Sequence, residues 1–362
     1  MDATERFAAV RQARQFLALS RRGETDGEYL AILAALAPIR PPSFVFPGTP
    51  VCLRGRHADP GPATGERVRR AGLVVKARFQ HGLVAYVPRK DIGLYAAAYA
   101  RPFQEDSLGL AVLDVLRAEG PLPRSLIAEM VGATGKVLTA ALNGLQRAFL
   151  VVDEQTETEW DSPWSAVSTE HPEWSEGRPP REAARAEVLR RFLGAYVVAT
   201  PREAADWSGF PLREATGLLN DLTERGCAMK ADGADGPTYA DATAVDERVV
   251  PEPSFTTLDP GDPLVSAQTT ALKARYPNPV LRWVYQDGFV VGAVEGRWGI
   301  YANHISVVNV PDAVGEREDL VRDVLADALS ALGQTDLPAD LLPFAPKDWT
   351  PPKAQVPVTA TD

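Results

Sequence analysis

One pattern occurs twice in the middle of this chain, and it constrains the fold more than any other feature. Residues 108–153 and residues 186–240 each show an amphipathic helix, a turn with proline or glycine, two further helices and then strand residues. Helices that follow one another through tight turns and end in a β-hairpin are typical of a winged helix. We therefore predict two winged-helix modules in tandem.

In the first copy, apolar side chains recur three or four residues apart from Leu108 to Leu116, and Gly120 and Pro121 end that helix. The spacing predicts a single buried stripe. The other predicted elements of this copy are helices over 124–131 and 136–147, with Val137 facing the core, and a strand over 149–152.

The second copy has the clearer helix boundaries. The segment Thr200-Pro201-Arg202-Glu203 combines an N-cap, a proline at the first helical position and a capping-box glutamate. Gly209 and Pro211 then separate this helix from one over 212–222, whose leucines, including Leu212, are predicted to face inward. Asp-Gly pairs at 232–233 and 235–236 supply the turn of a wing hairpin. The third helix of such a module most often enters a DNA major groove, but winged helices also bind proteins, and both alternatives stay open here.

Charge is distributed unevenly along the chain. The full sequence has 38 Lys and Arg, 48 Asp and Glu and a net charge of -10. Residues 1–100 hold 15 of the basic and 8 of the acidic residues, a net of +7, so the remainder carries -17. A basic cluster of this kind is the electrostatic signature of a phosphate-binding surface. The alternative is a solvated helix face. The candidate nucleic-acid-binding residues are Arg40, Arg54, Arg56, Arg67, Arg69, Arg70, Lys76, Arg78 and Lys136.

The rest of the chain completes an α+β protein with three tandem winged-helix modules and a C-terminal antiparallel β domain with a long helix. Four strands are expected between Leu281 and Val310, with turns at 287–288 and 295–296 and a helix over 315–332. Because tryptophans at 160, 164 and 174 would not suit a plain linker, we expect the acidic connector to pack over its neighbours. The predicted divisions are 1–103 (basic winged helix), 104–153 (second winged helix), 154–184 (connector), 185–250 (third winged helix), 251–335 (β domain) and 336–362 (proline-rich tail).

Composition excludes several other classes. The longest apolar run, residues 30–39, is too short to span a bilayer and contains Pro38, so no membrane association is expected and the protein is predicted to be cytoplasmic. The two cysteines lie far apart in sequence and the four histidines lack ligand spacing. We expect no metal, no cofactor and no structural disulfide.

The order of parts resembles the bacterial AlkZ/YcaQ-type DNA glycosylases. The segments that carry the resemblance are residues 207–215 (WSGFPLREA), the Asp262-Pro263-Leu264-Val265 motif and the strand at 288–292. The resemblance implies a concave channel that binds double-stranded DNA, including damaged DNA. It also implies an enzyme that excises bulky alkylated or crosslinked purines. In this family two residues of the loop after the second helix of the first module position the attacking water. The first is a glutamine, and the second, two positions later, is a glutamine or an aspartate.

This sequence departs from the family at that loop. Aligning Leu36-Ala37-Pro38-Ile39 with the family's leucine-glycine-glycine-leucine places Arg40-Pro41-Pro42 at the catalytic pair. An arginine only donates hydrogen bonds and a proline side chain offers none, so neither accepts a proton from water. The tryptophan and arginines that usually follow the Asp-Pro-Leu motif are also absent, since Ser266-Ala267-Gln268 stands there.

Three functions remain open from the sequence. The first is a duplex DNA-binding protein of glycosylase architecture, active in damage recognition or repair and associated with the nucleoid, without the usual base excision. The second is an active glycosylase for alkylated purines that uses a displaced acid such as Asp59 or Glu66. The third is a transcription regulator or interaction scaffold.

Overall fold

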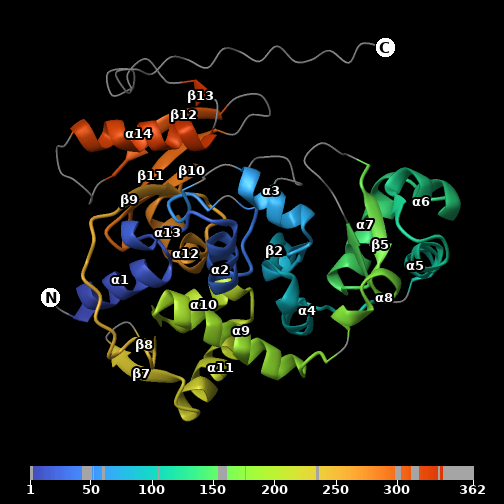
Figure 1. The fold of residues 1–362 in the computed structure, drawn as a ribbon, viewed down its shortest axis with the longest axis horizontal. Coiled ribbons are helices and arrows are strands. Elements are labelled where there is room, and N and C mark those ends of the chain that lie inside the picture. Colours follow the sequence, from blue (N-terminus) through green and yellow to red (C-terminus); the bar gives the residue numbers. More distant parts are fainter. Residues whose placement is uncertain are drawn as a thin grey trace.

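A computed structural model shows a disc-shaped body with one lobe at its side (Figure 1). The structure describes residues 3–42, 51, 53–58, 62–104, 106–153, 161–175, 177–233, 236–297, 303–310, 318–332 and 335–336. The lobe contains the helices α5 to α7, and the remaining modules make up the disc, with the C-terminal sheet and α14 at its edge. The mixed α+β class predicted from the sequence is confirmed.

The first module follows the order that its sequence predicts, with helices over 8–19, 26–37 and 65–73 and then a strand pair over 74–79 and 83–87. A capping box between Thr25 and Glu28, which sequence reasoning did not single out, begins its second helix. The apolar pattern of residues 8–19 predicts a first helix that runs to Leu19, but the helix ends at Arg14, and Phe16 takes a positive φ of 58°. The elements are α1 (Ala3–Arg14), η1 (Leu19–Arg21), α2 (Asp26–Leu36), α3 (Pro62–Arg70), β1 (Val74–Arg78), η2 (Gln80–Gly82), β2 (Val84–Pro88), η3 (Arg89–Asp91) and α4 (Ile92–Tyr99).

The second module forms the lobe and has a hydrophobic core of its own. Its third strand, β5, lies inside the segment expected to be a connector and pairs with both β3 and β4, so the module continues past Asp153. Val137, predicted to face the core, is 64% exposed because it lies outside the buried stripe that Leu138, Leu142 and Leu145 form on α7. The elements are α5 (Ser107–Glu119), β3 (Leu122–Pro123), α6 (Arg124–Val131), α7 (Gly135–Arg147), β4 (Val151–Asp153) and β5 (Pro163–Ala166).

The connector packs as its tryptophans suggest. Trp164 lies against the core of the second module, and Trp174 is buried with its ring stacked on His171 at a centroid distance of 4.1 Å. Trp160 lies outside the described residues. Two short elements occur here, α8 (Val167–Glu170) and η4 (Pro172–Trp174).

The third module confirms the helix boundaries read from Thr200 and Gly209. The side chains of Thr200 and Glu203 form the capping box, and Gly209 ends the helix in the left-handed conformation. A Cβ atom on Gly209 would lie 2.7 Å from the backbone nitrogen of His81, so this turn packs directly on the first module. Leu212 is 46% exposed rather than inward. The elements are α9 (Arg181–Tyr196), β6 (Val198–Ala199), α10 (Pro201–Ser208), α11 (Leu212–Glu224), β7 (Ala228–Gly233) and β8 (Gly236–Asp241).

The C-terminal domain is a five-stranded sheet in the order β13-β12-β11-β10-β9. Its pairs are antiparallel except β12 with β13. The turn predicted at Glu295-Gly296 is wrong, because β11 runs on through these residues with a shift of register. Residues 298–302, 311–317 and 337–362 lie outside the described part of the chain. The elements are β9 (Phe255–Leu258), α12 (Pro263–Ala267), α13 (Thr269–Arg275), β10 (Val280–Gln286), β11 (Phe289–Arg297), β12 (Asn303–Asn309), α14 (Glu318–Leu332) and β13 (Thr335–Asp336).

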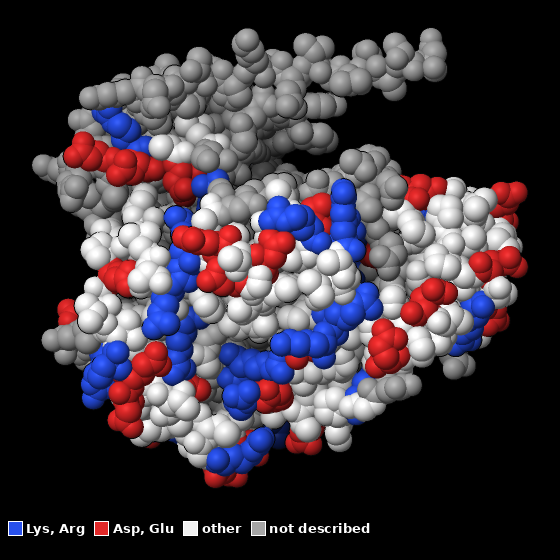
Figure 2. Space-filling view, in the orientation of Figure 1, with Lys and Arg blue, Asp and Glu red and all other residues white. Residues whose placement is uncertain are grey.

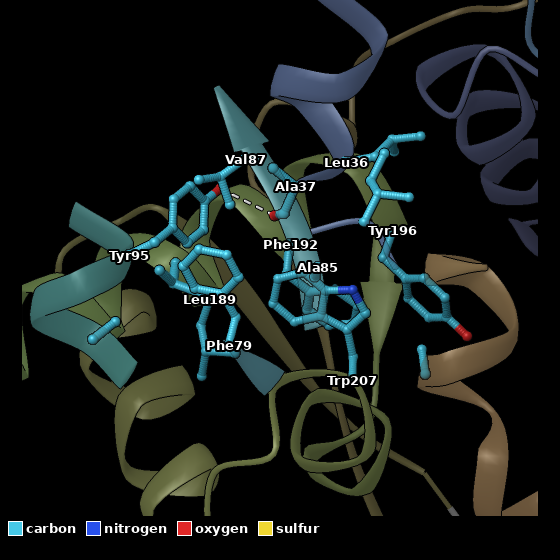
Figure 3. Packing of buried hydrophobic residues seen from close by; sticks show 14 of the residues in the cluster. Leu36, Ala37, Phe79, Ala85, Val87, Tyr95, Leu189, Phe192, Tyr196 and Trp207 are labelled. Carbon is cyan, nitrogen blue, oxygen red and sulfur yellow. Dashed lines mark hydrogen bonds between the residues drawn. The ribbon is translucent and has the colours of Figure 1, made fainter. Parts of the chain in front are cut away.

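One continuous core joins the first module, the third module and part of the C-terminal domain. Figure 3 shows where the first and third modules meet in this core. Phe192 of α9 and Trp207 of α10 stack at a centroid distance of 4.6 Å. Tyr95 of α4 reaches the segment after α2 and donates a hydrogen bond to the carbonyl of Ala37 at 3.0 Å. These three parts therefore hold one another, and the loop after α2 lies on a rigid base.

No single helix in the described ranges has the length and hydropathy to cross a bilayer, although the bent pair α6 and α7 passes that test when taken together.

Candidate catalytic loop and nucleic-acid interface

The loop that aligns with the family's catalytic pair is fixed by backbone contacts. Ile39 and Tyr86 form an antiparallel bridge, with N–O distances of 3.0 and 2.8 Å in the two directions. Together with the hydrogen bond from Tyr95 to Ala37, this bridge holds the chain immediately before Arg40. The side chain of Arg40 therefore projects from a preorganised base.

Arg40 binds the C-terminal domain. Its guanidinium donates a hydrogen bond to the hydroxyl of Ser266, the residue that begins the second departure from the family pattern. Burial lowers the pKa of the Arg40 guanidinium, while the charges of Asp259 and Asp262 oppose that shift. A Cβ atom on Gly261 would lie 3.2 Å from the Cβ of Arg40, so the two segments are in close contact. The two departures from the family sequence thus meet in one site.

Arg56 is not available to phosphate, contrary to its selection from the sequence. Its side chain is 2% exposed and forms a two-pronged ion pair with Asp262, with distances of 2.5 and 3.0 Å. Its Nε atom donates to the carbonyl of Gln15 at 2.9 Å. Asp262 also caps α12 by accepting from the backbone nitrogen of Leu264. Arg56 therefore joins the first module to the C-terminal domain.

Lys76 and Arg54 also link separate parts of the molecule. The Lys76 side chain is 6% exposed and its Nζ lies 3.2 Å from the carboxylate of Asp153, on the second module. The Arg54 side chain is 18% exposed and contacts Asp327 of α14 at 2.7 Å. Buried or half-buried side chains of this kind bind their partners rather than an external polyanion, because leaving the partner would strand a partly buried carboxylate. The basic cluster of the sequence is thus partly internal.

The helix α3 carries the exposed part of that cluster. Arg70 is 77% and Arg67 is 57% exposed, whereas Arg69 is 15% exposed. Each has an acidic neighbour, since Arg67 contacts Asp26 at 2.6 Å and the other two contact Glu66 at 2.6 to 2.7 Å. Surface pairs of this type are weak and exchange readily for phosphate contacts. Arg67 and Arg70 are therefore the cations of this helix that an external anion can reach.

Glu66 acts as a charge partner in this arrangement. Hydrogen bonds from Arg69, and secondarily from Arg70, hold its pKa below the ordinary glutamate value. Because the folded-state pKa is lowered, these bonds stabilise the fold above the ordinary pKa, and that stabilisation is lost as the pH falls through the lowered one. A carboxylate with both oxygens occupied by guanidinium groups is a poor base. The other displaced acid considered, Asp59, lies outside the described residues.

The second module adds basic groups next to the first. Arg78 of β1 donates to Gln146 at 2.6 Å and to Asn143 at 2.8 Å, both on α7, and burial and the nearby Arg147 lower its pKa. Lys136 and Arg147 are exposed on the same helix. The α7 sequence contains no acidic residue, whereas α11 of the third module contains Glu214, Asp221 and Glu224. Of the two repeated modules, the second therefore has the third helix more suited to a phosphate backbone.

Lys and Arg side chains gather over one face of the disc in bands that border an uncharged hollow, with acidic side chains between them (Figure 2). Arg67, Arg70 and Lys136 are the exposed members of the predicted set, while Arg40, Arg54, Arg69 and Arg78 are half-buried and Arg56 and Lys76 are buried. Sequence reasoning did not assign roles to Asp259 or Ser266. The signal available for them was the N-cap pattern of Asp262-Pro263, which places a helix start beside the loop.

Comparisons with known proteins agree with this geometry. The family model described as DNA glycosylase AlkZ-like matches residues 149–335, just over half of the chain. The solved structure of Streptomyces sahachiroi DNA glycosylase AlkZ is similar with a TM-score of 0.68 and 16% sequence identity, over 93% of this chain and 100% of that one. At this identity the likeness establishes the fold. No curated protein matches the sequence at a significant level. The chain belongs to the AlkZ-like DNA glycosylase family.

Proposed function

We propose that this protein binds double-stranded DNA, including damaged DNA, in lesion recognition or repair, and that it does not excise bases by the family's usual chemistry. The observation that carries this proposal is the contact of Arg40 with Ser266 at the position of the catalytic pair. Such a protein acts at the nucleoid.

The chemistry of base excision explains why this replacement matters. A water that attacks the anomeric carbon must lose a proton to an acceptor, and the sugar develops positive charge as the base departs. Arg40 holds donors only, and Pro41 and Pro42 have no polar side-chain atoms. A guanidinium beside an oxocarbenium also raises the barrier by electrostatic repulsion.

Exposed cations on two elements support the binding half of the proposal. Arg67 and Arg70 lie on α3, and Lys136 and Arg147 lie on α7. Because α3 packs against β1, and Arg78 of β1 donates two hydrogen bonds to α7, the two basic elements keep a fixed relation to each other. Phosphate contacts from both elements would position the duplex without reading its sequence.

Duplex binding is tested by titrating a fluorescent 20-base-pair duplex at several salt concentrations. The expected result is a binding constant whose logarithm falls linearly with the logarithm of the salt concentration, by about 0.9 for each phosphate contacted. Binding that does not change with salt would remove the proposal. A duplex with one N7-alkylguanine, compared with its undamaged counterpart, measures the preference for damage.

Membership in a glycosylase family favours one second candidate, an active glycosylase with a displaced acid. Glu66→Gln separates the two functions. If Glu66 is a charge partner, the variant frees Arg69 and Arg70, and duplex affinity is expected to rise about threefold to tenfold at low salt. If Glu66 is the catalytic base, the variant abolishes release of free base and affinity changes little.

A further inference from the structure

An open hollow lies between α1, α2 and α9, away from the Arg40 loop. Its volume is about 660 Å³, within the range of ~300–1,000 Å³ that is usual for small-molecule sites. Small side chains of these three helices line it, together with Phe16, Arg21 and Lys90. We propose that this hollow binds a nucleoside 5'-phosphate, with the base on the apolar floor beside Phe16 and the phosphate at Arg21 and Lys90.

The floor of the hollow suits a flat apolar group. Alanines of α1 and α2 lie opposite Gly194 and Ala195 of α9, so these elements place small side chains around the space. Phe16 adds an aromatic ring at the end of α1. Every nucleobase has a π-face that stacks on an aromatic ring, whichever base it is.

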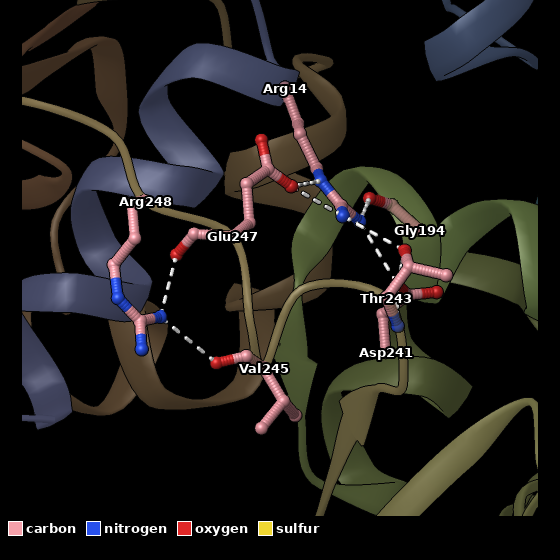
Figure 4. A network of polar contacts seen from close by, with 7 residues as sticks. All are labelled: Arg14, Gly194, Asp241, Thr243, Val245, Glu247 and Arg248. Atoms are coloured by element: carbon pink, nitrogen blue, oxygen red, sulfur yellow. Dashed lines mark hydrogen bonds and ion pairs between the residues drawn. The ribbon is translucent and has the colours of Figure 1, made fainter.

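The acidic groups of the hollow are already neutralised. Glu247 accepts from Arg14 at 2.6 Å, and the same guanidinium binds Asp241 at 3.0 Å and the carbonyl of Gly194 at 2.8 Å (Figure 4). Asp91 lies 3.2 Å from Arg191. These ion pairs build the wall and leave little negative charge to repel an anion.

Two cations at the rim remain for a ligand. Arg21 and Lys90 are both exposed, and among the residues that the structure describes neither forms an ion pair within 4.0 Å, although Arg21 lies close enough to Glu252 for its charge to help lower the pKa of that carboxyl. They come from η1 and η3, which lie on different sides of α2 in sequence. Two donors from separate elements at one opening are a suitable arrangement for a phosphate group.

The backbone conformation of Phe16 determines where its ring lies. It adopts φ = 58° two residues after the end of α1. There the backbone N–H of Leu17 donates a hydrogen bond to the carbonyl of Gln12 at 2.9 Å. Glycine normally occupies such a position, because a bulky side chain there strains the backbone. The same conformation occurs after α7 at Phe149 and after α9 at Val197, which are both buried in the core, so the positive φ fixes where the Phe16 ring lies and does not by itself indicate a ligand. The ring also packs partly against the core, so a purely structural role has to be separated by experiment.

The test measures binding of deoxyadenosine 5'-monophosphate to the full chain by titration calorimetry. Competition experiments then identify the source of the phosphate. Wild type is expected to bind it saturably, and Arg21→Gln and Lys90→Gln each to weaken binding about tenfold. Lys273→Gln, which changes an exposed lysine of α13 outside the hollow, is the matched control and should leave binding unchanged. Absence of saturable binding by wild type, or equal effects of Lys90→Gln and Lys273→Gln, would overturn the proposal.

Variants of Phe16 distinguish stacking from packing. Phe16→Leu keeps an apolar side chain but removes the aromatic face, and binding should weaken about tenfold, whereas Phe16→Tyr should bind as wild type does. Equal binding by both variants would contradict a stacking role. Melting temperatures of the two variants report the structural contribution separately.

The phosphate can come from a free nucleotide or from a single strand of nucleic acid, and competition decides between these sources. Labelled nucleotide is displaced either by a dT10 oligonucleotide or by unlabelled nucleotide. If the oligonucleotide displaces it at the lower concentration, the ligand is a single strand. If the unlabelled nucleotide does so, the ligand is a free nucleotide. The inference does not depend on duplex binding by α3 and α7. Charge changes on those helices are expected to leave nucleotide binding intact. Failure of duplex binding would therefore not contradict nucleotide binding in the hollow, and the reverse also holds.

Discussion

Asp262→Asn is expected to lower the free energy of unfolding by about 3–5 kcal/mol, because it leaves the Arg56 guanidinium buried without a counter-charge. Arg56 is 2% exposed and both of its terminal nitrogens bind this carboxylate. An asparagine still caps α12, so the loss reports the ion pair rather than the helix start. Urea denaturation followed by circular dichroism measures the change.

The matched control is Asp221→Asn, which removes one partner of an exposed pair. Arg225 and Asp221 lie one helical turn apart on and after α11 and are 55% and 49% exposed. Their pair is expected to contribute no more than about 0.5 kcal/mol. If Asp262→Asn destabilised the protein no more than this control, Arg56 would not be a buried link between the first module and the C-terminal domain.

Reversing two charges on α3 is expected to produce the largest loss of duplex binding. The double variant Arg67→Glu/Arg70→Glu replaces the two most exposed arginines of that helix. Since each phosphate contact contributes about one unit to the salt dependence, the slope of log K against log salt should fall by about 2. Affinity at low salt should fall at least about tenfold, since the new carboxylates also repel phosphate. Fluorescence anisotropy over a range of salt concentrations measures both quantities.

Arg213→Glu/Arg225→Glu is the control for this prediction. It makes the same change of charge at two exposed arginines of the third module, beside the acidic residues of α11. Its slope should stay close to that of wild type. Equal slopes for the two double variants would mean that net charge, rather than a surface on α3, governs binding.

Local signals in the sequence were sufficient for most helix boundaries. The helix at 124–131 has the predicted limits, because Gly132 adopts the left-handed conformation that ends it. The capping box at Thr200 likewise needs only residues within one turn. By contrast, α4 has apolar residues on all sides, since it is buried between other elements, and so it lacks the stripe that marks an amphipathic helix.

Long-range partners explain what the sequence could not predict. The strand β5 gains its place only by pairing with β3 and β4, and no local pattern within the acidic connector indicates those pairs. The density of arginines between 54 and 78 predicts a phosphate-binding surface, yet Arg56 finds Asp262 more than 200 residues later and becomes buried. Composition locates cations along the chain, but the fold decides which of them face solvent.

The central claim is that the protein binds DNA but lacks the family's base-excision centre, and single-turnover base release tests it most directly. Protein in excess over a duplex with one N7-methylguanine, at a concentration that binds all of the duplex, is sampled for free base by chromatography. The account predicts that binding is complete and that base appears no faster than in the duplex alone. Release of one equivalent of base well above that background rate would contradict it.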